Sequence, residues 1–226
     1  MQQFIERPEV QLSEDWMIVV FFLVLSSIAY TRAWFPSRLK NMWRSIFNTT
    51  VLRQTIREES NVPKEYVLFQ LNFFMISGMI VLLLMKYFSF DFFGWPSIAW
   101  YGLIVTGIAL LYALKSLGLW FVIILINGDF TLLEYRYIVF LTHRVLGILL
   151  LPVAVMIAYL PKKDLPLLFF TAAGVFLLAY LYRVSKGLIN ALLSGVGVFY
   201  IFFYICTLEI LPVIVGIKFF ISQKPL

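Results

Sequence analysis

The sequence predicts an all-α, polytopic integral membrane protein with about six transmembrane helices and a basic amphipathic interfacial helix. Hydrophobic residues make up 62% of the chain, against about 45–50% in ordinary globular proteins. Charged residues make up only 13%. The apolar residues also occur in runs of about 20, the length that a helix needs to cross a hydrocarbon core of roughly 30 Å. Because the backbone finds no water in lipid, these runs must be hydrogen-bonded helices.

We predict a single membrane domain over residues 1–226, with a span for each apolar run. The predicted spans cover residues 16–35, 66–87, 98–120, 137–159, 165–182 and 196–219. The first run follows an acidic segment, whereas a cleaved signal peptide begins with basic residues, so we expect a retained helix. The third run is too long for one span, and we expect residues 121–127 to continue obliquely or along the interface. Residues 183–195 are expected to form a basic, mildly amphipathic connector.

The loop over residues 36–64 carries the predicted interfacial helix. Leu39, Met42, Trp43, Ile46 and Phe47 follow the spacing of one apolar helix face. A basic amphipathic helix beside a span usually lies in the membrane interface. Such a helix is either a docking surface for anionic lipid or a partner, or an anchor that only follows the charge rule. The residues that would dock the lipid or partner are Arg38, Lys40, Trp43, Arg44 and Phe47.

Lysine and arginine also predict the orientation. The face that holds the 36–64 loop is richer in these residues than the opposite face, so we place it in the cytoplasm and both termini in the periplasm. The net charge of +6 is therefore interpreted as a topology signal and as attraction to anionic lipid. We expect the bilayer, and other membrane proteins, as partners, and no nucleic acid.

A few ionisable side chains fall inside the predicted spans. Inserting each of them at the centre of the bilayer costs about 2.5–3.5 kcal/mol, so we expect each to have a structural or functional role. Glu209 lies near the middle of the sixth span, followed by Pro212. Its carboxylate is either a proton- or cation-binding group or a structural group paired with a base. Arg144 and Lys115 are the competing partners. His143, beside Arg144, is most simply a hydrogen-bonded core residue.

Several classes of site are excluded or disfavoured. Cys206 is the only cysteine and His143 the only histidine, so the chain has no internal disulfide, no cysteine zinc site and no haem held by two of its own histidines. Gly195 and Gly197 do not form a nucleotide loop, because no strand precedes them and no Lys-Ser/Thr follows. No nucleophile–base pair and no cluster of metal ligands can be identified in the sequence. We therefore expect no cofactor and no metal, and we favour a non-catalytic protein over an enzyme.

The chain resembles a family of membrane proteins from Bacteroidota that is known only as a domain of unknown function, the four-two-seven-one family. The similarity rests on TRAWFPSRLKNMWRSIFN, YALKSLGLWF, THRVLGILLLP and the closing CTLEILP. It covers about residues 16–220. The resemblance implies an inner-membrane protein of a Gram-negative bacterium and no established activity. Lys115 and Glu209 fall inside the shared motifs.

Two function classes remain. The first is a non-catalytic scaffold or assembly subunit of a membrane complex, favoured by the amphipathic helix and by the missing catalytic set. The second is a small carrier for a proton, an ion or a lipid-like solute, with Glu209 as the coupling carboxylate and Arg144 or Lys115 as its counter-charge.

Overall fold

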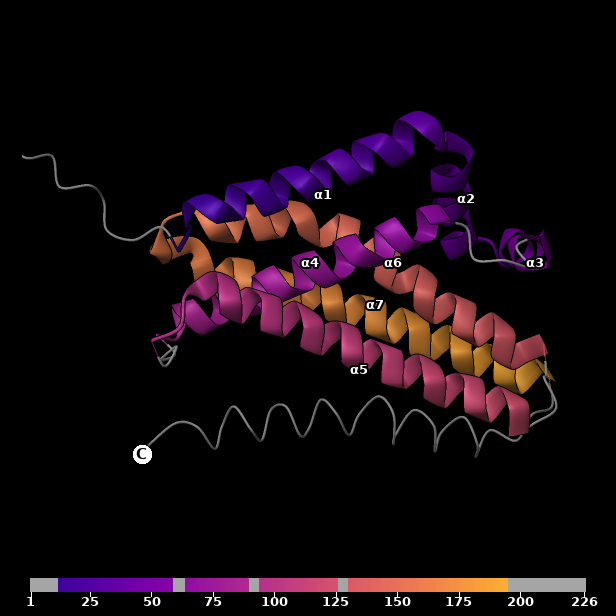
Figure 1. Cartoon of the computed structure of the whole chain (residues 1–226). Helices are drawn as coiled ribbons and strands as arrows, with labels where there is room; N and C mark the ends of the chain where they lie inside the picture. Colours follow the sequence, from indigo (N-terminus) through magenta and orange to yellow (C-terminus); the bar gives the residue numbers. More distant parts are fainter. Residues whose placement is uncertain (1–11, 59–63, 90–93, 126–129, 195–226) are drawn as a thin grey trace, which may run out of the picture.

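A computed structural model describes residues 12–58, 64–89, 94–125 and 130–194 (Figure 1). These ranges hold helices and no strand. The helices are α1 (Asp15–Trp34), α2 (Pro36–Phe47), α3 (Thr49–Glu58), α4 (Lys64–Tyr87), α5 (Ser97–Leu125), α6 (Phe130–Tyr159), the short 3₁₀ helix η1 (Lys162–Asp164) and α7 (Leu165–Ser194). The predicted span 196–219, which includes Glu209, lies outside the described residues.

Five of the described helices, α1, α4, α5, α6 and α7, are long and apolar enough to cross a membrane. Their outer faces carry exposed Leu, Ile and Phe side chains, such as Phe22, Leu110 and Phe170. A monomer in water rarely exposes so much apolar surface, whereas lipid solvates such a surface favourably. The chain is thus a multi-pass helical membrane protein, which confirms the predicted fold class.

Two helices, α6 and α7, run further than the sequence predicted, and α5 continues as helix beyond its predicted span, one of the two courses expected for residues 121–127. α5 continues unbroken to Leu125, α6 begins at Phe130, and α7 continues through the expected connector to Ser194. Helices of 29 or 30 residues are about 45 Å long. Because this exceeds the hydrocarbon core, they must tilt or project from it. The extensions of α6 and α7 contain charged residues that are good helix formers and contain no proline, so nothing ends these helices where the apolar run ends.

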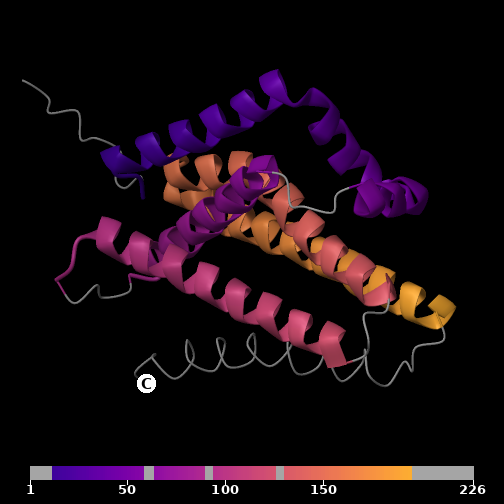
Figure 2. The same cartoon turned by 45° about the vertical axis from the view of Figure 1, so that its right-hand side comes forward.

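α4 and α6 form the centre of the bundle, and α1 and α5 lie on opposite flanks (Figures 1 and 2). A close approach of α6 to α4 occurs at Gly147, where a Cβ atom would lie 2.8 Å from the Cα atom of Phe73. Small residues permit such contacts between membrane helices. The small residues 171–174 of α7 do not make such a contact, because Ala172 is the only one of them that is buried and a Cβ on Gly174 would have open space around it.

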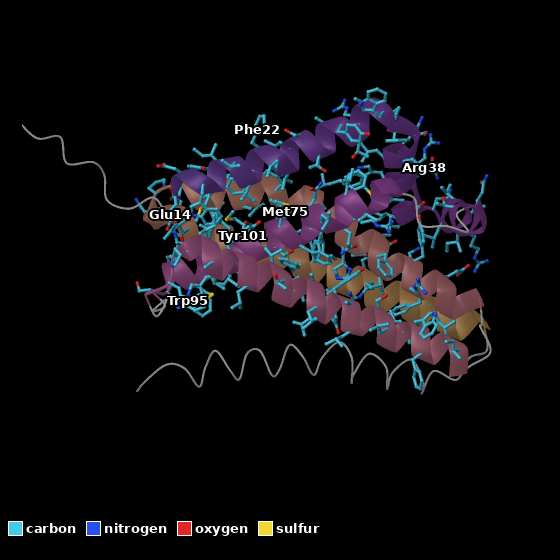
Figure 3. The ribbon with its side chains drawn as sticks, viewed as in Figure 1. Glu14, Phe22, Arg38, Met75, Trp95 and Tyr101 are labelled. Atoms are coloured by element: carbon cyan, nitrogen blue, oxygen red, sulfur yellow. The ribbon has the colours of Figure 1, made fainter. Side chains whose placement is uncertain are left out.

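Side-chain hydrogen bonds join α1 to its neighbours. Inside the bundle, Asn72 of α4 donates to the hydroxyl of Ser27 on α1 at 3.1 Å. At one end, the Glu14 carboxylate accepts hydrogen bonds from Lys86, Ser97 and Trp16. We call these four residues the Glu14 clamp. It ties the start of α1 to the end of α4 and the start of α5, and Figure 3 shows Glu14 and Tyr101 at this end, with Arg38 at the other.

At the far end of the bundle, α2 and α3 form an elbow that we call the platform (residues 36–58). α2 starts with Pro36, whose fixed φ suits the first helical position. The two helices break at Asn48, which is extended, and its side-chain oxygen accepts from the backbone N–H groups of Thr50 and Val51 at 2.9 and 3.4 Å. Asn48 therefore caps the start of α3 and fixes the angle of the elbow.

Candidate functional site

The platform is packed against the membrane helices and does not hang as a loop. Met42 of α2 and Leu52 of α3 are buried in a small core with Phe69 of α4 and with Ile138 and Leu141 of α6. The predicted amphipathic helix is present as α2, but part of the apolar face of this helix contacts protein. Met42 is 1% exposed, because α2 folds back onto the bundle (Figure 2).

Two polar contacts add to this packing. The guanidinium Nε of Arg53 on α3 lies 2.6 Å from a carboxylate oxygen of Glu134 on α6, and the Glu134 side chain is 3% exposed. The hydroxyl of Tyr182 on α7 donates to the backbone carbonyl of Ile46 on α2. An ion pair with one buried partner is costly to break, because the remaining charge has lost its water. Together with the small core, these contacts hold the platform to α4, α6 and α7.

The five predicted docking residues divide between two faces of α2. Lys40 and Arg44 are exposed and Arg38 is half-buried. Trp43 and Phe47, by contrast, line a groove. Residues three and four positions apart are neighbours on a helix surface, so the basic face of Lys40 and Arg44 borders the aromatic face directly.

This groove, which we call the platform groove, lies between α2, α6 and α7 and has a volume of about 460 Å³. Its walls are almost wholly apolar. They are formed by Trp43, Ile46 and Phe47 of α2, Thr142, Val145, Leu146 and Leu149 of α6, and Val175, Leu178, Ala179 and Tyr182 of α7. The size falls in the range of about 300–1,000 Å³ typical of small-molecule sites.

The predicted intramembrane residues that the structure describes, His143, Arg144 and Lys115, gather on the other side of α6. The His143 ring lies edge-on to Phe73 of α4 and to Tyr112 of α5, with ring centroids 4.8 and 5.0 Å away. Its Nδ1 atom is hydrogen-bonded to the Val139 carbonyl one turn earlier. His143 thus joins three helices through an aromatic cluster, an arrangement that holds the ring in place and leaves it little access to water.

Cationic side chains surround this aromatic cluster. Arg144 is buried and its guanidinium carbon lies 5.9 Å from the Phe140 ring centre. Arg183 of α7 is also buried, and its guanidinium carbon lies 5.4 Å from the Tyr180 ring centre. Lys115 of α5 is half-buried. We call Lys115, Arg144 and Arg183, together with the His143 ring that they approach, the intramembrane cationic cluster, in which the three long side chains carry the charge. Cation–π contacts lower part of the cost of holding these charges away from water.

Arg144 lies further from the start of its helix than the sequence predicted. Since α6 begins at Phe130, Arg144 lies fourteen residues, or about 21 Å, from that end. The sequence had placed it about 10 Å from the end of a shorter span. Glu209, the expected counter-charge, lies outside the described residues, so its pairing with Arg144 or Lys115 stays a prediction.

Sequence reasoning missed Arg183 and Glu134. Both were assigned to loops beside shorter spans, but they lie inside long helices and are buried. The sequence has no proline and no turn motif between either residue and the neighbouring span, and this absence could have predicted that the helices continue through both residues. Within the described ranges, no group of three His, Cys, Asp or Glu side chains is placed to hold a metal ion.

Comparison with known proteins agrees with this architecture. A family model described as a domain of unknown function (DUF4271) matches residues 17–220. The chain belongs to the DUF4271 family. The match runs from α1 through α7 and beyond, so it covers the platform and both motifs around Lys115 and Arg144, and it confirms the resemblance seen in the sequence. No curated protein and no solved structure matches the chain.

Proposed function

We propose that this DUF4271 protein is a non-catalytic scaffold or assembly subunit of a membrane complex. The observation that carries the proposal is the platform, a basic helical elbow that a buried core and the Arg53–Glu134 ion pair fix to the membrane bundle. We place the protein in the cell inner membrane of a Gram-negative bacterium, with the platform in the cytoplasm and both termini in the periplasm, from the lysine and arginine distribution and from the family resemblance.

A fixed platform is suited to recognition because it presents its exposed side chains in one geometry. Lys40 and Arg44 of α2 and Thr50 of α3 are exposed on it. A surface that is already ordered loses less conformational entropy when a partner binds than a flexible loop would lose. The basic residues fit an acidic partner surface, and such complementarity mainly governs the association rate and the choice of partner.

The test is purification of the tagged full-length protein from native membranes in a mild detergent. We expect a defined set of membrane proteins to elute with it. The double variant K40E/T50E should remove them, since it reverses the platform charge, and a glutamate in the first turn of α3 agrees with the helix dipole. K163E alters an exposed lysine at the opposite end and should retain them. A wild-type protein that elutes alone as a monomer would refute the scaffold.

The intramembrane cationic cluster supports a carrier as the second candidate. Buried cations at membrane depth often mark ion or solute pathways. A carrier requires water to reach the cluster and Glu209, and it requires the Glu209 carboxyl group. In a C206S background, cysteines placed at Lys115 and Ser116 should then react with a water-soluble maleimide, and E209Q should abolish transport. The scaffold instead predicts that E209Q still captures the same partners.

A further inference from the structure

The walls of the platform groove consist almost wholly of hydrocarbon side chains. Two hydroxyl groups line it, and both are already used within the protein, Thr142 as a donor to Ile138 and Tyr182 as a donor to Ile46. The rim is open, because Phe47 is 82% exposed and Leu178 68%. From Thr142 to Leu149 the groove follows α6 for seven residues, about 10 Å. An apolar groove of this length, open on its flank, suits part of an acyl chain.

Cations border one end of the same groove. Lys186 lies one turn beyond Tyr182 on α7, and its Nζ atom is 5.9 Å from the centre of the Tyr182 ring, which forms part of the groove wall. Lys40 and Arg44 border the Trp43 and Phe47 side of α2. An apolar channel with several cations at one end has the polarity of an anionic phospholipid, whose chain would fill the channel and whose phosphate would meet the cations.

Other occupants have the wrong charge. Residues 195–226 contain Glu209, Lys218 and Lys224 as their charged residues, and Glu209 is expected inside a span. This segment is net positive and does not neutralise Lys186, Lys40 and Arg44. A second copy of the chain carries a net charge of +6, which disfavours its association with this basic end of the groove.

We propose that the platform groove is a binding site for one anionic membrane phospholipid, with an acyl chain between α6 and α7 and the phosphate held by Lys186 and Arg44. The site shares Arg44 with the platform surface assigned to the scaffold, but binding of the lipid does not require the scaffold function. It would make the packing of α2 on the bundle depend on the lipid composition of the membrane, because the lipid contacts both.

The experiment is a lipid titration of the delipidated full-length protein, followed by native mass spectrometry. Phosphatidylglycerol and phosphatidylcholine with the same acyl chains are the probes. We expect wild type to retain one phosphatidylglycerol in preference to phosphatidylcholine. A179W fills the groove from α7 and should abolish this single retained lipid. L110W places the same ring on a lipid-exposed face of α5, away from the groove, and should retain it.

The headgroup contact is tested without altering the groove. K186Q and R44Q should each reduce the preference for phosphatidylglycerol by about fivefold, the equivalent of about 1 kcal/mol per surface cation. These variants also cover the case in which A179W does not fold, which its elution profile would reveal. Equal retention of phosphatidylglycerol by wild type and a folded A179W would overturn the proposal. So would an unchanged headgroup preference in the K186Q/R44Q double variant.

Discussion

Glu14 is the residue at which α1, α4 and α5 meet, and its ionisation should make stability depend on pH. Burial acts to raise its pKa, but hydrogen bonds from Lys86, Ser97 and Trp16 outweigh this, so the pKa lies below the ordinary value of 4.5. The clamp therefore contributes its full stabilisation to the free energy of unfolding above about pH 4.5, where the carboxylate is ionised in both the folded and the unfolded state. This stabilisation is lost as pH falls through the lowered pKa of the folded state.

The variant E14Q should lower the free energy of unfolding at pH 7 by no more than about 1 kcal/mol, because the carboxylate is partly exposed and solvent screens the pair. It should also flatten the dependence of the melting temperature on pH between 5 and 3. The measurement is thermal unfolding in detergent over that range. D164N, at an exposed site near the same end, serves as the control. An equally steep pH dependence in E14Q would show that other carboxylates are responsible.

Among the glycines that the structure describes, Gly147 should be the one at which substitution is least tolerated. A methyl group there would meet the backbone of Phe73 at 2.8 Å, and backbone atoms in a packed helix have no alternative position. We expect G147A to cost about 1–3 kcal/mol, the usual range for overpacking. G102A on α5 has open space around its Cβ atom and should be neutral or slightly stabilising. Chemical unfolding of both variants in detergent measures the difference, and similar values would contradict this packing.

At the scale of elements, the attachment of the platform should depend on Glu134. Replacing it with glutamine removes the charge that faces Arg53 and should cost about 1–3 kcal/mol, the penalty for a poorly satisfied buried polar group. Because the loss is local, we expect faster amide hydrogen exchange in α2 and α3 and unchanged exchange in α1. Exchange that rises equally in all helices would indicate general destabilisation in place of a released platform.

Most elements were predictable from sequence, but their ends and contacts were not. Apolar runs identify α1, α4, α5, α6 and α7, since lipid solvation alone demands helices there. The periodicity of Leu39 to Phe47 likewise identifies α2. Where α6 begins and α7 ends depends on helix propensity outside the lipid, which carries no hydropathy signal. The burial of Glu134 and the groove beside Trp43 arise from α2 folding back on α6 and α7, a tertiary contact that no local pattern encodes.

For the molecule as a whole, the orientation follows from charge and can be tested by labelling. The platform carries most of the Lys and Arg bias, so we expect it in the cytoplasm. In a C206S background, T50C on the platform should resist a membrane-impermeant maleimide in spheroplasts, and K163C, exposed at the opposite end, should react. Both should react after the membrane is permeabilised. The reverse pattern would invert the topology and move the platform to the periplasm.

The charge balance inside the membrane also belongs to the whole molecule, because it links residues on several helices. Arg144 lies about 21 Å from the platform end of α6, and Lys115, ten residues before Leu125, about 15 Å from the same end of α5. Glu209, thirteen residues into the predicted span 196–219, is expected at about 20 Å. Because α5 and α6 can project from the hydrocarbon core, Arg144 and Lys115 lie less deep in it than these distances, and a long extended side chain on either would cover most of the difference in depth to Glu209. We therefore expect Glu209 to be coupled energetically to at least one of the two bases.

Double-mutant cycles that combine E209Q with K115M and, separately, with R144M measure this coupling in detergent unfolding. A direct partner should give a coupling energy of about 0.5–3 kcal/mol, because removing the second charge relieves the base that the first change left buried. Pairing E209Q with K163M, at an exposed site far from the cluster, should give additive effects. Additivity in both test cycles would mean that Glu209 meets neither base, and the carrier proposal would lose its counter-charge.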